Sequence, residues 1–215
     1  MGLVFLLPSS LLRVFFIVQI VCLCTCVQSQ CKRNPVLFNF GDSNSDTGSS
    51  DYGLGQTVAP PYGRTFFHHP AGRPSDGRLI IDFICEGLGA SFLTPYLEPI
   101  APNFTSGANF ALSGAAILSR PKPFNVDVQL AQFLHFRNRS ALLASQGYRG
   151  LVREEEFSNA LYTLDIGQND LAASFLNLTF DQVVDKIPSF MAELKNTIRA
   201  SYYPYPCPHR FLRPK

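Results

Sequence analysis

Short apolar runs alternate with longer amphipathic stretches along most of this chain. Residues 36–40 and 161–166 are apolar, aromatic and β-branched, which predicts two buried strands. Residues 107–111 form a shorter strand-like run, and the small residues after them predict a turn. Helical patterns separate these runs. This alternation favours a parallel sheet wrapped by helices, which is the arrangement of α/β proteins.

Two segments before residue 150 have helical patterns. The apolar residues 79–84 predict the first part of a buried helix. The helix is expected to end near Gly87 or Gly89, because glycine commonly follows the last helical turn. Residues 126–144 predict an amphipathic helix. Its apolar stripe consists of Leu130, Phe133, Leu134 and Ala141.

A proline divides the last helical region. Thr179 and Gln182 have the spacing of a capping box. Pro188 is costly inside a helix, so we expect a new helix to begin there. Two polar segments complete the pattern. Residues 51–78 are rich in Gly, Pro and Asp and predict a long loop of functional character, and the glutamates at 154–156 predict a solvated helix start.

Composition indicates one globular domain without an electrostatic preference for a partner. The chain has 215 residues, of which 46% are hydrophobic and 16% charged, enough to bury a substantial core. The net charge of +2 provides no argument for binding nucleic acid or an acidic partner. No cysteine pair has the spacing of metal ligands, and we expect no metal and no organic cofactor.

The first thirty residues have the pattern of a targeting segment. Residues 11–27 are mostly apolar, are short for a membrane span and are followed by Gln28 and Ser29. We interpret residues 1–29 as a secretory signal peptide with cleavage near Ser29. An uncleaved anchor is the weaker alternative, because the start of the segment is poor in positive charge. The mature protein is therefore expected to be secreted, with no stable membrane anchor.

The cysteines and glycosylation triplets are interpreted for a chain that has a signal peptide. Removal of the signal peptide leaves Cys31, Cys85 and Cys207, an odd number that implies one free thiol or a missing partner and leaves the pairing open. Three Asn-x-Ser/Thr triplets after a signal peptide suggest surface glycans. Their acceptors are Asn103, Asn138 and Asn177.

The segment of residues 41–48 is the most informative for function. It reads Gly-Asp-Ser-Asn-Ser-Asp-Thr-Gly and directly follows the first predicted strand, so Ser43 stands on a turn at the carboxyl edge of the sheet. The alternative is an ordinary solvated turn. The segment resembles the first signature block of the plant-type GDSL esterases and lipases of the SGNH hydrolase superfamily. That resemblance implies a flavodoxin-like three-layer α/β/α fold with a parallel sheet, and Ser43 as the catalytic nucleophile.

Two later blocks resemble the same family. Residues 109–114 are similar to its second block, which implies that the N–H of Gly114 is an oxyanion donor, although Ser113 stands where many relatives have another glycine. Residues 167–170 match its third block, which implies that the Asn169 side chain is a second donor, with the N–H of Ser43 as the third. The alternatives are helix–strand packing for Gly114 and turn capping for Asn169.

Further segments at 62–63, 72–78 and 82–83 also resemble the family. Surface-loop and helix-packing roles account for them, and we assign them no catalytic role. The whole resemblance covers roughly residues 36–199.

The base that would activate Ser43 is missing from the pattern. The family takes its catalytic Asp and His from a late Asp-x-x-His block, which this sequence lacks. The histidines present have no such context, and solvated surface positions account for them: His68, His69, His135 and His209. Residues 203–215 are proline-rich where an α/β fold needs another strand. Our hypothesis is a truncated product with a partial hydrolase domain over residues 30–202, incomplete at its C-terminal side, and an atypical tail.

Two functions follow. The first is a secreted serine esterase or lipase that hydrolyses a small-molecule carboxylic ester through an acyl-enzyme and is weak or inactive in this form. The second is a non-catalytic secreted glycoprotein fragment that binds an acyl or carbohydrate ligand. The pattern leaves the acyl group, the alcohol and the oligomeric state open.

Overall fold

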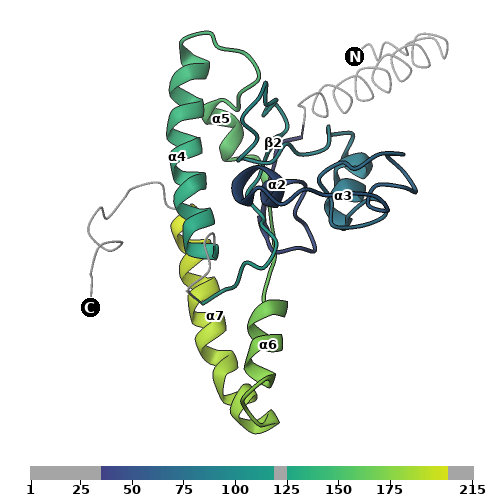
Figure 1. Ribbon diagram of the computed structural model, residues 1–215. Helices are drawn as coiled ribbons and strands as arrows, with labels where there is room; N and C mark the ends of the chain where they lie inside the picture. Colours follow the sequence, from purple (N-terminus) through teal and green to yellow (C-terminus); the bar gives the residue numbers. More distant parts are fainter. Residues whose placement is uncertain (1–34, 119–124, 203–215) are drawn as a thin grey trace, which may run out of the picture. The chain divides into compact units, whose positions relative to one another are not determined.

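A computed structural model describes residues 35–118 and 125–202 (Figure 1). The predicted signal peptide, Cys31, Cys207 and the tail with His209 lie outside the described residues. In chain order, the elements are β1 (Leu37–Gly41), α2 (Ser49–Leu54), α3 (Ile80–Leu88), β2 (Gly107–Asn109), α4 (Val126–Ser145), α5 (Glu154–Phe157), β3 (Leu161–Asp165), α6 (Gln168–Phe175) and α7 (Phe180–Tyr202).

The described strands form one parallel sheet in the order β2-β1-β3. In the central strand, Leu37 pairs with Gly107 on one side and with Leu161 on the other. Every connection between the strands contains helix, as parallel strands require. The predicted α/β fold with a parallel sheet is confirmed.

Helices cover both faces of β1, because its side chains alternate between two cores. Phe38 and Phe40 pack against α4 on one face, while Leu37 packs against α3 on the other (Figure 1). The first core is largely aromatic: the Phe38 ring stacks on Phe157 at 5.1 Å and meets Phe133 edge-on at 5.2 Å. The central strand is therefore held from both sides, which makes its carboxyl end a rigid support for the turn after it.

Most predicted elements are found within one or two residues of their expected bounds. The helix after the long loop ends at Leu88, and Gly89 closes it in the left-handed conformation. Thr179 and Gln182 form the predicted capping box, with the Thr179 N–H donating to Gln182 Oε1 at 3.0 Å. The predicted loop begins later than residue 51, because α2 continues to Leu54.

The prediction that residues 161–166 form a buried strand is wrong in one respect. The strand exists as β3, but it is the edge of the described sheet, and Leu161 and Tyr162 are exposed. An apolar run is typical of a strand covered on both sides, and the pattern alone does not distinguish a central strand from an edge strand of the described sheet.

The prediction that a new helix begins at Pro188 is also wrong. One helix, α7, runs through it from Phe180 to Tyr202. Val183 and Phe190 are buried on the same side of α7, before and after the proline. Burial of one continuous apolar face therefore outweighs the loss of a helical hydrogen bond.

Replacing Pro188 with alanine is expected to raise the free energy of unfolding by about 2 kcal/mol. Proline inside a helix costs roughly 3 kcal/mol, and the entropy that it removes from the unfolded chain offsets up to about 1 kcal/mol of this. Urea unfolding followed by far-ultraviolet circular dichroism measures the change. A variant less stable than the wild type would show that the proline ring itself packs favourably.

None of the helices in the described part of the chain is long and apolar enough to cross a membrane.

Candidate active site

The parallel sheet brings the three segments of the candidate site to one edge. In the sheet register, Gly41 at the end of β1 is opposite Asp165 at the end of β3, and Asn39 pairs with Asn109 at the end of β2. Parallel strands end at the same edge, so the turns that follow them start as neighbours. These turns carry Ser43, Gly114 and Asn169.

The turn that carries Ser43 requires a glycine at its first position. A Cβ on Gly41 would lie 2.3 Å from the Asp165 carbonyl oxygen, so only glycine allows β1 and β3 to approach this closely. The Asp42 N–H then donates to the same carbonyl at 3.2 Å, and Asp42 Oδ1 accepts the Asn44 N–H at 3.0 Å. Ser43 is half-buried at the top of this turn.

The side chain of Gln129 on α4 forms hydrogen bonds with both the N–H and the carbonyl of Gly41. Its Oε1 accepts the Gly41 N–H at 2.9 Å, and its Nε2 donates to the Gly41 carbonyl at 2.8 Å. Gln129 is fully buried. This residue was not predicted as part of the site, although a glutamine near Leu130 and Phe133 on the apolar stripe of α4 is a visible signal. The pair of hydrogen bonds fixes the start of the serine turn relative to α4.

Asp46 joins the serine turn to the turn that contains Gly114. Its Oδ1 accepts the N–H groups of Gly48 and Ser49 at 2.9 and 2.7 Å. Its Oδ2 accepts both the N–H and the hydroxyl of Ser113, at 2.8 and 2.9 Å. The serine at a position where many relatives have glycine therefore has a specific partner in this chain.

Gly114 adopts a left-handed conformation, with φ of 83°. Within the described part of the chain, neither its N–H nor that of Ser43 donates a hydrogen bond. An unused backbone N–H at a strand end is available to a substrate oxygen. This is the property that an oxyanion donor needs.

Asn169 lies in the first turn of α6 and contacts the Gly114 segment. Its Nδ2 donates to the Ala115 carbonyl at 2.9 Å, which uses one of the two amide hydrogens. Nearby, Asn44 Nδ2 donates to Gln168 Oε1 at 2.9 Å. Hydrogen bonds thus link all three predicted segments to one another.

Asp170 reinforces the same arrangement and was not predicted as part of the site. Its buried carboxylate accepts the N–H groups of Ile117 and Leu118 at 2.8 and 3.2 Å. The sequence does contain a signal for Asp170, which is its position as the final aspartate of the Gly-x-Asn-Asp block.

The long loop is attached to the serine turn by a buried ion pair. Arg73 donates from Nη2 to Asp82 Oδ1 at 2.8 Å and from Nη1 to the Thr47 carbonyl at 3.2 Å. Its guanidinium also lies 4.9 Å from the centre of the Phe67 ring. Surface-loop and helix-packing roles were expected for the segments at 62–63, 72–78 and 82–83, and Arg73 is buried, where it bonds to Asp82 of α3 and to the serine turn.

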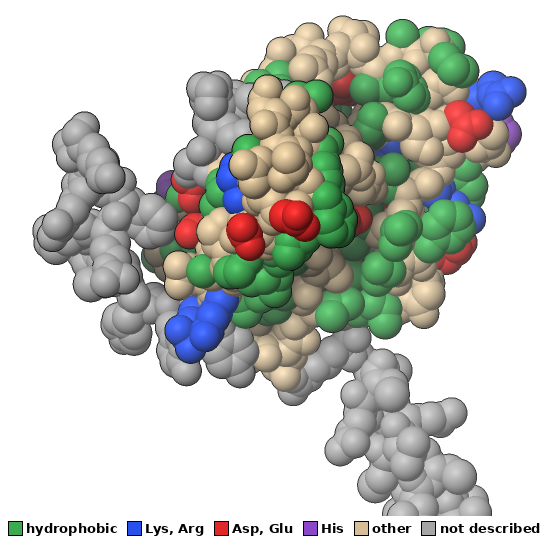
Figure 2. All heavy atoms as spheres, turned by 90° about the horizontal axis from the view of Figure 1, so that it is seen from below, with side chains coloured by type: hydrophobic (Ala, Val, Ile, Leu, Met, Phe, Trp, Pro, Cys, Tyr) green, Lys and Arg blue, Asp and Glu red, His purple; other side chains and the backbone are tan. Residues whose placement is uncertain are grey.

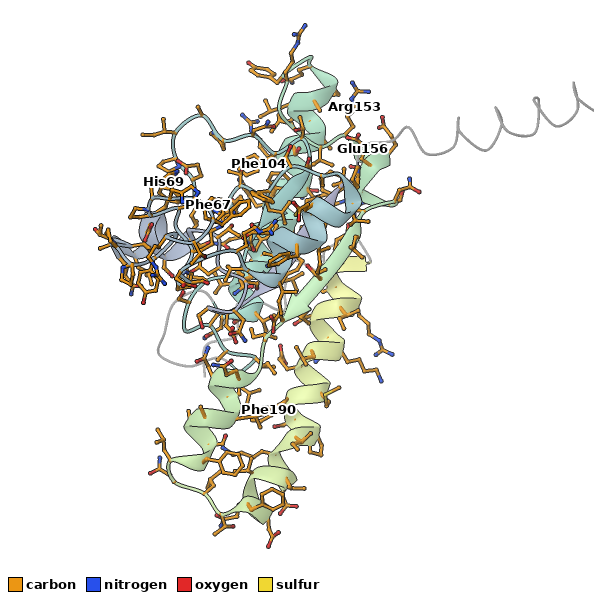
Figure 3. The ribbon with its side chains drawn as sticks, turned by 90° about the vertical axis from the view of Figure 1, so that its right-hand side faces the viewer. Phe67, His69, Phe104, Arg153, Glu156 and Phe190 are labelled. Atoms are coloured by element: carbon orange, nitrogen blue, oxygen red, sulfur yellow. The ribbon has the colours of Figure 1, made fainter. Side chains whose placement is uncertain are left out.

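The described histidines lie apart from these contacts. His68, His69 and His135 are exposed, and no hydrogen bond joins any of them to Ser43. His69 lies beside Phe67 on the long loop, and its Nδ1 is 2.8 Å from the Pro70 carbonyl oxygen (Figure 3). The region that the structure covers contains no cluster of His, Cys, Asp and Glu suited to a metal ion.

Asp42 is an unusual carboxyl group beside the candidate nucleophile. Its Oδ2 is buried without a hydrogen-bond partner. Burial raises the pKa of Asp42, and the negative charges of Asp165 and Asp170 add to the effect, while the Asn44 N–H opposes it. The neutral acid is thus favoured in the folded state over a wider pH range than in the unfolded chain.

Replacing Asp42 with asparagine is expected to stabilise the fold at neutral pH and to leave it nearly unchanged in acid. The stability from the proton of Asp42 is fully present below the ordinary pKa of 3.8 and is lost as pH rises through the raised value. Asparagine keeps the acceptor for Asn44 and does not titrate. Urea unfolding between pH 3.5 and 7.5 tests this expectation, and a pH-independent difference would contradict it.

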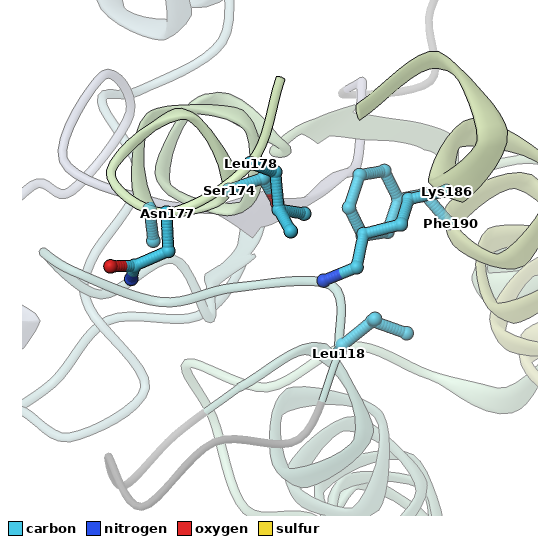
Figure 4. A pocket seen from close by; sticks show the side chains of 7 residues that line it. Leu118, Ser174, Asn177, Leu178, Lys186 and Phe190 are labelled. Atoms are coloured by element: carbon cyan, nitrogen blue, oxygen red, sulfur yellow. The ribbon is translucent and has the colours of Figure 1, made fainter. Parts of the chain in front are cut away.

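A cavity of about 330 Å³ lies between α6, α7 and the segment at Leu118 (Figure 4). Its lining is mostly apolar, with Phe190 from α7 and the Lys186 ammonium group at its wall. Neither Ser43, Gly114 nor Asn169 lines it, so it is separate from the candidate catalytic residues.

Comparison with known proteins identifies the family to which these segments belong. The family model described as GDSL-like Lipase/Acylhydrolase matches residues 37–208. The chain belongs to this family. GDSL esterase/lipase At3g62280 of Arabidopsis thaliana is 47% identical over 199 residues, which cover 90% of this chain and 54% of the relative. The resemblance on which the sequence prediction rested is confirmed.

Two further relatives show the range of names within the family. GDSL esterase/lipase ACHE of Zea mays is 49% identical over 183 residues, which cover 78% of this chain and 46% of the relative. Alpha-L-fucosidase 3 of Arabidopsis thaliana is 47% identical over 180 residues, which cover 78% of this chain and 48% of the relative. This GDSL-family chain spans about half the length of the relatives it matches.

Proposed function

We propose that this chain supplies the nucleophile and the oxyanion donors of a secreted hydrolase that acts on carboxylic esters. The observation that carries the proposal is the convergence of three family blocks at one sheet edge, with the N–H groups of Ser43 and Gly114 unused. Gly114 and Asn169 are the donors whose chemistry suits a developing oxyanion, because both are neutral and neither competes as an acid.

The proposed reaction is acyl transfer through Ser43. Its Oγ attacks the ester carbonyl carbon and loses its proton to a base, and the carbonyl oxygen becomes an oxyanion held by the three donors. Collapse of the tetrahedral intermediate expels the alcohol, which takes up the proton, and leaves an acyl-enzyme that water hydrolyses. In the family, the base is the histidine of the Asp-x-x-His block, so we propose that the 215-residue chain alone is weak or inactive.

Hydrolysis of p-nitrophenyl acetate and butyrate tests this proposal. The assay compares the chain alone with a chimera in which its residues 30–202 replace the matching segment of the maize relative, each beside its Ser43→Ala variant. We expect turnover by the chimera that disappears with Ser43→Ala, and little turnover by the chain alone. A folded chimera that hydrolyses neither ester would contradict the proposed function. Cleavage of p-nitrophenyl α-L-fucoside, prompted by the name of one relative, would redirect it to glycosides.

We also propose that the chain is secreted with glycans at exposed asparagines. Asn103, Asn138 and Asn177 all lie at the surface. Expression in plant or insect cells, followed by treatment with a peptide N-glycosidase, measures the number of glycans by the change in mass. Retention of residues 1–29 and the absence of glycans on the product would contradict secretion.

A second candidate function is ligand binding without hydrolysis. It is favoured by the exposed positions of the described histidines and by the cavity at Phe190 and Lys186, whose apolar wall and single ammonium group suit a fatty acid. Titration of the inactive chain with octanoate tests it, with Lys186→Met as the variant. Saturable binding that Lys186→Met weakens, together with no esterase activity in the chimera, would favour this function over the first.

A further inference from the structure

A row of side-chain hydrogen bonds crosses the described sheet. Asn39 on β1 is paired with Thr163 on β3 and with Asn109 on β2. Thr163 Oγ1 donates to Asn39 Oδ1 at 2.8 Å, and Asn39 Nδ2 donates to Asn109 Oδ1 at 2.7 Å. We call these three side chains the polar ladder. Because each member donates to the next in the same direction, from β3 to β2, the bonds strengthen one another.

The polar ladder ends on the serine turn. Asn109 Nδ2 donates to the Ser45 carbonyl at 2.7 Å and to Thr47 Oγ1 at 2.8 Å. Ser45 lies two residues after Ser43 in the sequence, whereas the contact of α4 with Gly41 lies two residues before it. The turn is therefore bonded to the rest of the fold on both sides of the candidate nucleophile.

The same amide also bonds to the start of the segment that carries Gly114. Asn109 Oδ1 accepts the Ala111 N–H at 3.0 Å in addition to the bond from Asn39. A side-chain amide has two donor hydrogens and two acceptor positions, and all four are used here. The Asn109 side chain is therefore fixed in one orientation. It connects the turn of the nucleophile to the segment of an oxyanion donor.

The two amides of the polar ladder lie in the interior. Asn39 is 1% exposed and Asn109 is 0% exposed. Figure 2 shows the contrast with the surface at the α6–α7 end, where apolar side chains gather. A buried amide is unfavourable unless its hydrogen bonds are made, and an apolar pair of the same shape would fill the space without that requirement. The two asparagines therefore indicate a role in positioning rather than in stability.

We propose that Asn109 is a positioning residue for the ester hydrolysis proposed for Ser43, and this inference rests on that function. The Asn109 side chain sets the position of the Gly114 N–H relative to the nucleophile, because it bonds to both segments. The other two members of the polar ladder orient its amide from β1 and β3. Asn109 makes no contact with the ester, since its four hydrogen-bonding positions are used within the protein. Its loss nevertheless slows the reaction, because a shift of about 1 Å between reacting groups lowers a rate about 100-fold.

Asn109→Ala in the chimera with the maize relative tests this role, and Asn39→Ala is the matched control. Both substitutions remove a buried amide of the polar ladder, but only Asn109 contacts the serine turn and the Gly114 segment. For p-nitrophenyl butyrate, we expect Asn109→Ala to lower kcat about 100-fold and to change KM less than about 3-fold. Asn39→Ala should lower kcat less than about 5-fold at a similar melting temperature. Equal loss of kcat in the two variants would overturn the proposal.

Amide hydrogen exchange of the chain alone provides a second measurement, which does not depend on activity. Asn109→Ala should speed exchange in residues 43–49 and 110–114 at least about 10-fold relative to Asn39→Ala. Unchanged exchange in these two segments would overturn the proposal, whether or not the chimera hydrolyses esters. Faster exchange together with a chimera that hydrolyses no ester would support the positioning of both turns by Asn109 and count against the proposed function, so the two failures are distinguishable.

A second pair of variants decides the question if Asn109→Ala does not fold. Thr47→Val removes the hydroxyl that accepts from Asn109, and Thr163→Val removes the hydroxyl that donates to Asn39, each with little change in shape. We expect Thr47→Val to lower kcat and to speed exchange in the serine turn by about 10-fold, and Thr163→Val to change both by much less. Equal effects of the two variants would overturn the proposal.

Discussion

Replacing Arg73 with alanine is expected to lower the free energy of unfolding by about 3–5 kcal/mol, the usual effect of removing one partner from a buried ion pair. Asp82 is fully buried and accepts two hydrogen bonds from Arg73, at 3.2 and 2.8 Å. Without the guanidinium, the carboxylate keeps only the Leu79 N–H at 3.0 Å. A buried charge is then left almost unpaired.

Urea unfolding measures this loss, and a nearby ion pair provides the control. Arg64 pairs with Asp76 at 3.1 Å, but the two side chains are 69% and 53% exposed. Arg64→Ala is therefore expected to change the stability by less than about 1 kcal/mol. The double variant Arg73→Ala/Asp82→Asn should recover part of the loss, because no charge then remains buried. Equal effects of Arg73→Ala and Arg64→Ala would contradict the role given to the buried pair.

Replacing Asn169 with alanine is expected to lower kcat of the chimera about 100- to 1,000-fold, the usual effect of removing one oxyanion donor. KM should change little, because the donor acts on the charge of the transition state more than on the bound ester. The measurement is steady-state hydrolysis of p-nitrophenyl butyrate.

Asn169 also bonds to the Ala115 carbonyl, so its substitution needs a control for a structural effect. Gln168→Ala removes the neighbouring hydrogen bond to Asn44 and should lower kcat by much less. Thermal unfolding of both variants completes the comparison. If both variants lost the same activity and their melting temperatures fell by the same amount, the loss of kcat would be explained by lower stability. Asn169 would then only support the turn.

The strands and the candidate site could be predicted because their signals are local. The run that ends at Gly41 has the composition of a buried strand, and parallel pairing then places the turns after β1, β2 and β3 at one edge without further information. The hydrogen bonds of Asn169 and Asp46 show how those turns contact one another. Their individual partners depend on which backbone atoms meet, and no spacing in the sequence encodes that.

Other features could not be predicted because they depend on distant parts of the fold. The pattern of β3 is that of an interior strand, and only the sheet order reveals that no strand among the described residues pairs with its far side. Pro188 lies in a helix because Val183 and Phe190 are buried together against neighbouring elements. Arg73 is buried where it pairs with Asp82 of α3, which is nine residues later in the sequence. In each case, tertiary packing overrides a local preference.

The two hydrogen bonds between the Gln129 side chain and the Gly41 backbone affect the dynamics of the site. The Gly41 N–H is bonded to a side chain of α4, so its hydrogen can exchange with solvent only when α4 moves away from the strand. The neighbouring amides of β1 depend instead on separation from β2 or β3. Deuterium uptake at this one glycine therefore reports the detachment of α4 separately from the opening of the sheet. The same event frees the start of the Ser43 turn from α4 while the Asp42 N–H still bonds the turn to β3, so uptake at Gly41 reports one of the contacts that order the nucleophile without any substrate.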